Sequence, residues 1–146
     1  MVNALKVKIV KLHQDATIPK YAHAGDVCFD LVSVESVEVA AGRVVVVGTG
    51  LAMQPEPGYE LQIRPRSGLA AKHGITVLNS PATLEPTYTG EIKVILHNTS
   101  TDSYSVKKGD RIAQAVFKEY RPVEFTEVDK LAATERGARG LGSSGK

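Results

Sequence analysis

The sequence predicts an all-β subunit, a distorted jelly roll or β-barrel with one short helix and a flexible C-terminal arm. Short apolar segments recur at regular spacing, and clusters of glycine, proline and polar residues separate them, as is typical of such folds. No window of helical length shows a 3.6-residue period, apart from short stretches at 69–73 and 128–133. The chain ends in a glycine-rich stretch whose one bulky apolar residue is Leu141.

The first half of the chain alternates strand patterns with turn sequences. From Leu5 to Leu12, apolar side chains alternate with lysines, which is the period of a half-buried strand. The four consecutive valines within 43–47 predict a buried strand, because β-branched residues favour sheets. Turn residues at 41–42, 48–50 and 54–58 separate the segments. Further apolar or alternating segments lie at 27–32, 34–39 and 59–63.

The second half continues the pattern. Residues 69–73 follow a proline and a glycine and predict one helical turn. A strand is expected at 91–96, with Lys93 on the face opposite Ile92 and Val94. Other strand patterns occur at 104–106, 111–120 and 123–128.

Length and charge limit the possible functions. A chain of 146 residues is long enough for one domain with a real core, expected here at 1–133 with a flexible arm at 134–146. A net charge of +2 and few aromatic residues argue against a nucleic-acid surface. Cys28 has no second cysteine to pair with, which fits a cytoplasmic protein. We expect no signal peptide, since the N-terminus is short and charged, and no membrane partner, since no run has membrane-spanning length.

The stretch from Arg64 to Asn98 carries the candidate chemistry. Its first half, 64–68, holds two arginines, a serine and a glycine, and guanidinium and backbone N–H groups suit phosphate oxygens. Its second half, 79–90, holds one carboxylate, Glu85, and one tyrosine, Tyr88, between turn-forming residues. Together these features predict a nucleotide site with its own general base, although residues 65–68 alone would equally fit an ordinary basic turn.

The arm at 134–146 allows two interpretations. It cannot pack a core of its own, so it fits a disordered tail. Its arginines and paired serines, spaced by glycines, would also suit a segment that wraps a triphosphate once the ligand orders it.

Five patches in sequence order resemble the trimeric deoxyuridine triphosphatases (dUTPases), over nearly the whole chain. The patches are residues 24–31, 65–68, 79–91, 109–114 and 136–145. The resemblance implies a homotrimer of jelly-roll subunits, with active sites shared between subunits and closed by the C-terminal arm. It further implies Mg²⁺ held by the triphosphate and waters, and cleavage of dUTP to dUMP and pyrophosphate.

The resemblance also implies residue roles. Glu85 would be the catalytic base that activates the water attacking the α-phosphorus. Asp30 would orient a Mg²⁺-bound water or a neighbouring arginine, without binding the metal directly. The other implied contacts to substrate are Arg66, Ser67, Gly68 and Gln114 for phosphate, Asn79 with the backbone of Thr83 and Leu84 for uracil, Tyr88 under the deoxyribose, Lys93 at the pocket edge, and Arg136, Leu141, Ser143 and Ser144 in the arm.

Three positions depart from the family pattern. Glu85 replaces an aspartate, Ala82 replaces a glycine of the uracil hairpin, and Leu141 replaces the phenylalanine that usually stacks on the base. These departures keep open a nucleotide sensor with weak catalysis. A deoxycytidine triphosphate deaminase is a second alternative, because Glu85-Pro86 fits its hairpin, but Ile95 stands where that family carries a glutamate.

Overall fold

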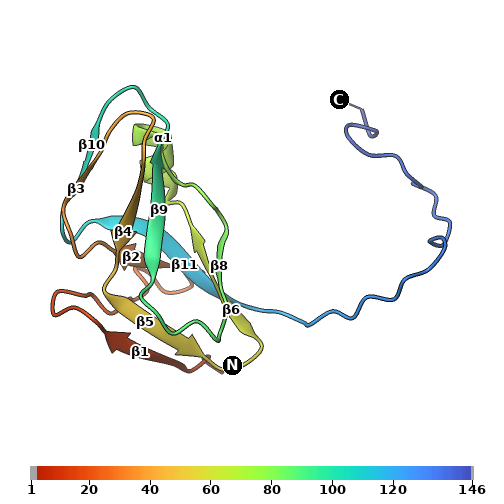
Figure 1. Cartoon of the computed structure of the whole chain (residues 1–146), viewed down its shortest axis with the longest axis horizontal. Helices are drawn as coiled ribbons and strands as arrows, with labels where there is room; N and C mark the ends of the chain where they lie inside the picture. The colour runs from red at the N-terminus through yellow and green to blue at the C-terminus, as the bar shows by residue number, and fades with distance from the viewer. Residues whose placement is uncertain (1–2, 146) are drawn as a thin grey trace.

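In the computed structural model, which describes residues 3–145, strands form the body and the chain after them extends away from it (Figure 1). The one helix among residues 3–145, α1, spans Ser67–His73. The strands in chain order are β1 (Val7–Lys11), β2 (Phe29–Val32), β3 (Val37–Val39), β4 (Val44–Gly48), β5 (Leu51–Pro55), β6 (Tyr59–Arg64), β7 (Ile75–Val77), β8 (Ala82–Leu84), β9 (Lys93–Asn98), β10 (Tyr104–Val106) and β11 (Arg111–Glu119).

The strands pair antiparallel in four small sheets. The four-stranded sheet has the order β2-β11-β6-β8, and a three-stranded sheet has the order β4-β9-β7. Two further pairs, β1-β5 and β10-β3, complete the jelly-roll-like arrangement. The predicted all-β class with one short helix is confirmed.

The core lies between the sheets and is built by the alternation of the strands. Leu31, Ile63, Leu96 and Val47 are among the side chains with almost no solvent exposure. The valine run was predicted to be buried as a whole, and this is wrong for Val44 and Val46, which are 45% and 55% exposed. Side chains alternate along β4, so Val47 lies on the face that joins the core, while Val44 and Val46 lie on the opposite face, which this chain leaves uncovered.

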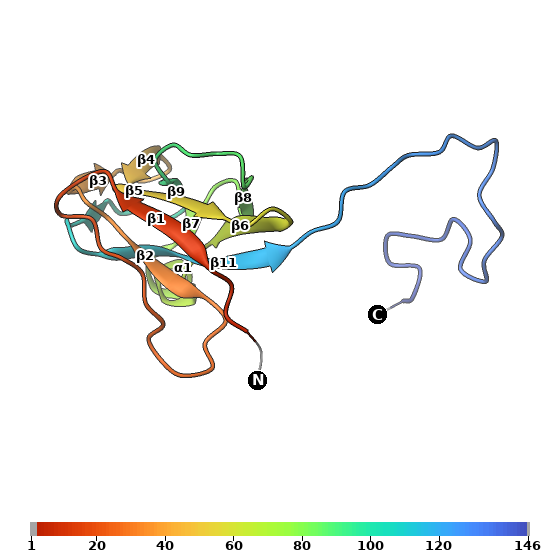
Figure 2. The ribbon, with the colours of Figure 1, turned by 90° about the horizontal axis from the view of Figure 1, so that it is seen from below.

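Several short strands were not predicted from the sequence, and the strand expected at 123–128 is absent from the described residues. β5, β7 and β8 were not anticipated, because they are three to five residues long and lack a clear period. Residues 123–128 and 128–133 form neither the strand nor the helix that their patterns suggested. The chain leaves the body after β11 (Figure 2), and the burial of its residues there is low throughout. A strand needs a neighbour, and this segment finds none within its own chain.

Asn98 organises the turn between β9 and β10 from inside the core. It is fully buried, and its amide donates to the carbonyl oxygens of Val39 at 2.8 Å and Asp102 at 2.7 Å. Its own oxygen accepts from the backbone N–H of Ser100 at 3.0 Å and from that residue's hydroxyl at 2.8 Å. Since every polar atom of the side chain is used, Asn98 joins β3 to the end of β9.

Replacing Asn98 by alanine should lower the free energy of unfolding by about 2–4 kcal/mol, because two carbonyl oxygens lose their donor and the turn loses its acceptor. Urea denaturation at fixed protein concentration measures the change. Ser103→Ala, an exposed position in the same connection, is the matched control and should shift stability by less than about 0.5 kcal/mol. Equal stability of the Asn98→Ala and Ser103→Ala proteins would contradict this account.

Candidate active site

A cavity of about 340 Å³ opens where β2, β11 and the β6–α1 junction meet. Four of its lining residues, Arg66, Ser67, Gly68 and Gln114, are the expected phosphate contacts. The other residues that line it are Ala22, Asp26, Val27, Cys28 and Asp30. The fold therefore brings the first, second and fourth sequence patches into one polar pocket.

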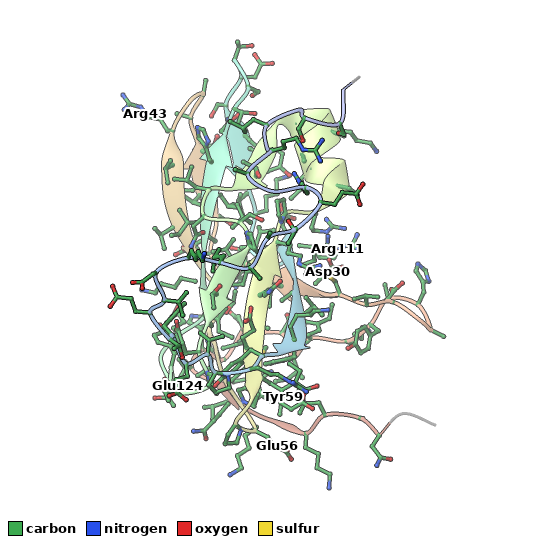
Figure 3. All side chains as sticks on the ribbon, turned by 90° about the vertical axis from the view of Figure 1, so that its right-hand side faces the viewer. Asp30, Arg43, Glu56, Tyr59, Arg111 and Glu124 are labelled. Atoms are coloured by element: carbon green, nitrogen blue, oxygen red, sulfur yellow. The ribbon has the colours of Figure 1, made fainter. Side chains whose placement is uncertain are left out.

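Asp30 holds the arginine of this pocket in place. Its carboxylate accepts from Nε of Arg66 at 3.1 Å and lies 3.7 Å from Nη1 of Arg111. Arg66 also donates from Nη1 to the backbone carbonyl of Arg111 at 3.3 Å. Asp30 and Arg111 lie side by side on neighbouring strands (Figure 3). Asp30 therefore contacts two arginines, and its expected role toward a Mg²⁺-bound water stays a prediction.

Gln114 fixes the turn that carries Arg66. In the register of the sheet it lies between Asp30 on β2 and Arg64 on β6. Its amide donates to the carbonyl oxygen of Pro65 at 2.9 Å. An amide nitrogen has two donors, so one N–H remains for a phosphate.

Helix α1 presents its first turn to the pocket. Arg66 precedes it with extended backbone angles and makes no side-chain cap. The amide of Ala70 makes the first bond of the helix, to the carbonyl of Arg66 at 3.0 Å. The amides at the start of a helix have no partner within it, so those of Ser67 and Gly68 can donate to an anion.

The far end of α1 packs against β10. The ring of His73 lies on that of Tyr104, with 5.0 Å between centroids. Burial raises the pKa of Tyr104, and the charge of Asp110 adds to this effect while Arg66 opposes it. The raised pKa keeps the Tyr104 hydroxyl protonated further into the alkaline range than in a free tyrosine, and its ring contacts His73 at the end of the helix.

The second group of candidates lies on the hairpin 79–90. Strand β8 is the edge strand of its sheet, and residues 82, 83 and 84 pair with β6 on one side only. The outward N–H and C=O groups of an edge strand are unpaired, which suits the reading of a base by the backbone of Thr83 and Leu84. Asn79 and Glu85, at the two ends of the strand, are exposed.

A turn links Glu85 to Tyr88. The N–H of Tyr88 donates to the carbonyl of Glu85 at 3.0 Å, with Pro86 in the second position of the turn. The Tyr88 hydroxyl donates to the carbonyl of Glu91 at 2.7 Å. The ring is 45% exposed, so it is available to a ligand and is not a core residue.

Within a single chain, the candidate site residues do not all lie in one pocket. Glu85, Asn79 and Tyr88 are absent from the lining of the phosphate pocket, and Lys93 is exposed on β9. In the arm, Leu141 is fully exposed, and Arg136, Ser143 and Ser144 are likewise exposed. The C-terminal segment as a whole lies away from the body in both ribbon views (Figures 1 and 2).

Three residues near the phosphate site had not been singled out from the sequence. Asp26 and Cys28 line the pocket, and Arg111 shares Asp30 with Arg66. Asp26 and Cys28 lie in the same patch as Asp30, and Arg111 lies in the same patch as Gln114. Their closeness in sequence to a predicted site residue was the signal that could have identified them.

Comparison with known proteins decides the family. The dUTPase family model matches residues 14–145. The chain belongs to the dUTPase family. A deoxyuridine 5′-triphosphate nucleotidohydrolase of Wolinella succinogenes is 54% identical over 142 residues, which cover 97% of this chain and 95% of the relative. The nucleotidohydrolase of the same name from Helicobacter hepaticus is 49% identical, over 99% of this chain and 92% of the relative.

Solved dUTPase structures share the fold. The dUTPase of Staphylococcus bacteriophage 80alpha, solved with dUpNHpp, has a TM-score of 0.90 at 24% identity, over 97% of this chain and 99% of the phage chain. A mutant dUTPase of phage phi11 of S. aureus, described with a structural Mg(II) ion, has a TM-score of 0.81 at 19% identity, over 88% and 99% of the two chains. Among residues 3–145, no helix is long and apolar enough to cross a membrane.

Arg66→Lys should weaken the binding of inorganic triphosphate by about tenfold. Lysine keeps the charge but cannot hold Asp30, the carbonyl of Arg111 and a phosphate oxygen at once. Isothermal titration calorimetry measures the affinity. Arg111→Lys is the matched control, because Arg111 is 58% exposed and its contact to Asp30 is the longer one. An equal loss in both variants would indicate that only net charge matters.

Proposed function

We propose that this dUTPase-family chain hydrolyses dUTP to dUMP and pyrophosphate, by attack of water on the α-phosphorus. The observation that carries the proposal is the pocket at the β6–α1 junction, where Arg66, Ser67 and Gly68 offer guanidinium, hydroxyl and backbone donors to a phosphate chain. The names of the relatives at about half identity support the same substrate. We place the reaction in the cytoplasm, in keeping with the single cysteine.

The chain's own residues divide the work of the reaction. Glu85 takes the proton of the attacking water, and its exposure in a single chain leaves it free to meet a phosphate bound elsewhere. Arg66 and the first amides of α1 bind the phosphates and neutralise the developing charge. The edge of β8 binds the base, and Tyr88 packs against the sugar. Arg136, Ser143 and Ser144 close over the β- and γ-phosphates, with Leu141 over the base.

The donors in the pocket suit Mg²⁺ bound mainly by the substrate. No cluster of three or more His, Cys, Asp or Glu side chains that could hold a metal occurs within residues 3–145. Asp26 and Asp30 line the same cavity as Arg66, so carboxylates are present to accept from metal-bound waters. The bound ion would supply charge neutralisation and orientation of the phosphate oxygens.

A homotrimer with shared sites accounts for the surfaces that a single chain leaves uncovered. Beyond β11, Val123, Phe125 and Leu131 are 73%, 93% and 86% exposed, which is unfavourable in water. On the body, an apolar cavity of about 720 Å³ runs along β1 and β11, with Val7, Ile9 and Phe117 in its lining. Such a surface would accept the apolar segment of another copy, and the phosphate pocket of one chain would then face the Glu85 hairpin of another.

Two truncations separate assembly from closure of the site. Deleting 134–146 should leave the oligomer intact and lower kcat/KM for dUTP by about 100-fold or more, because the arm has charged and hydroxyl donors but no core contacts. Deleting 121–146 should also dissociate the oligomer, because it removes the exposed apolar side chains. Sedimentation velocity and pyrophosphate release measure both. A full-length chain that sediments as a stable monomer at micromolar concentration would contradict the shared site.

Glu85→Gln should lose nearly all turnover and still bind dUTP, because the amide keeps the shape and removes the base. Glu85→Asp should keep activity, since the two acids differ little in intrinsic pKa, about 4.3 against 3.9. The added methylene of glutamate changes the position of the carboxylate, and a misplacement on the order of 1 Å can cost roughly 100-fold. Glu85→Asp should therefore raise turnover if the backbone of 79–90 has not adjusted to the longer side chain. Pyrophosphate release from dUTP, dCTP, dTTP and UTP with Mg²⁺ measures turnover.

The same assay tests the alternatives. Full activity of Glu85→Gln would transfer the role of base to another residue, with Asp30 the next candidate. Tight dUTP binding by the unmodified chain without pyrophosphate release would indicate the sensor. Ammonia released from dCTP would indicate a deaminase. The dUTPase family match and Ile95 both argue against that activity.

A further inference from the structure

Gly90 lies against the hydroxyl end of the ring of Tyr88. A Cβ atom placed on Gly90 would be 2.7 Å from Oη, 2.8 Å from Cζ and 3.2 Å from Cε2 of Tyr88. Non-bonded carbon atoms prefer separations of about 3.5–4.0 Å. The Tyr88 ring therefore occupies the space in which a side chain at position 90 would lie.

Glycine is required here for space and not for backbone conformation. Gly58 and Gly74 have positive φ values of 93° and 65°, which disfavour other residues, whereas Gly90 does not have a positive φ. An alanine at position 90 could adopt the same backbone. The effect of Gly90→Ala would therefore come from the contact with Tyr88 alone, which makes the substitution a clean steric test.

Two hydrogen bonds hold the ring over Gly90. The Tyr88 hydroxyl donates to the carbonyl of Glu91, and the Tyr88 N–H donates to the carbonyl of Glu85. Glu91 is itself packed closely, since its Oε2 lies 2.6 Å from the position that a Cβ on Gly48 would occupy. Because the hydroxyl is engaged within the hairpin, Tyr88 offers a ligand the exposed part of its ring.

We infer that Gly90 is a positioning residue that sets the discrimination between 2′-deoxyribose and ribose. By lacking a side chain it lets the Tyr88 ring lie low in the hairpin, at the height where a deoxyribose packs on the ring and a 2′-hydroxyl collides with it. This inference rests on the proposed function, which places the sugar against Tyr88. It adds that the height of the ring is determined by Gly90 and by the hydroxyl bond to Glu91.

Gly90→Ala displaces the ring and leaves the fold intact. Cζ of Tyr88 would have to retreat by about 0.7 Å to reach normal contact distance. Tyr88 is 45% exposed, so the ring can move into solvent without disturbing the core. The movement also breaks the bond to Glu91, and the ring then lies off the position that excludes the 2′-hydroxyl.

The expected result is a loss of sugar selectivity. Pockets that act by shape reject a substrate with one extra group by about 10–200-fold. We expect the ratio of kcat/KM for dUTP to that for UTP to fall about tenfold in Gly90→Ala, mainly through a lower KM for UTP, while kcat for dUTP stays within about threefold. Thr89→Ala, an exposed neighbour in the same loop, is the matched control and should leave the ratio unchanged.

A double-mutant cycle shows whether Gly90 acts through Tyr88. Gly90→Ala should have no further effect on the ratio in a Tyr88→Ala background. A full tenfold effect in that background, or an unchanged ratio in Gly90→Ala alone, would overturn the inference. If Gly90→Ala fails to fold, Tyr88→Phe provides the test instead, because it removes only the exposed hydroxyl that donates to Glu91. The ratio of kcat/KM for dUTP to that for UTP should then fall about threefold, and an unchanged ratio would overturn the inference.

The unmodified chain distinguishes this inference from the function on which it rests. Release of pyrophosphate from dUTP, with UTP turned over poorly, is the required starting point. Absence of any dUTP turnover would overturn the proposed function and the inference together. Selective dUTP turnover combined with an unaltered ratio in Gly90→Ala would overturn the inference alone.

Discussion

The contact of Asp30 with Arg66 and Arg111 is the interaction on which the phosphate pocket depends. It joins β2, β11 and the β6–α1 junction through one carboxylate. Arg66 and Asp30 are both largely covered, at 28% and 25% side-chain exposure, so their attraction is screened less than that of a surface pair. A guanidinium held this way already points at the pocket before a ligand arrives, which lowers the entropic cost of binding.

The pairing register of β11 with β2 and β6 determines which residues meet at the Asp30–Arg66 contact. Gln114 lies opposite Asp30 on one side and opposite Arg64 on the other, and its amide fastens Pro65. A slip of one residue in β11 would turn Gln114 to the other face and separate the pocket from its turn. The core residues flanking Gln114, Ala113 and Ala115, are fully buried, so the hydrophobic pattern of β11 also fixes the geometry of the polar site.

How much the sequence could predict depends on how local each feature is. The turn 65–68 has distinctive local residues and lies where α1 begins, as its pattern suggested, whereas strand β8 within 79–90 was not anticipated. The partner of Arg66 was not determined by pattern, since Asp30 lies 36 residues away and the pairing requires the register of β2 with β11. Gly90 looked like a turn residue, and its close approach to Tyr88 is visible only in three dimensions.

The patterns that misled have a common physical cause. Alternation at 123–128 and the valines of β4 report apolar faces, and each pattern was taken to mean burial within the chain. Both apolar surfaces are exposed in the structure. The predictions failed because a sequence pattern shows that a surface is apolar and does not show which molecule covers it. The wrong predictions therefore mark apolar surfaces that this chain does not cover by itself.

The exposed arm can change in sequence without changing the stability of the folded body. Residues 134–145 are exposed throughout, so a substitution there leaves the folding equilibrium of the body almost unchanged. Cellular proteases that remove unfolded chains would not detect such a change. The arm can therefore vary in sequence with little effect on the abundance of the folded protein.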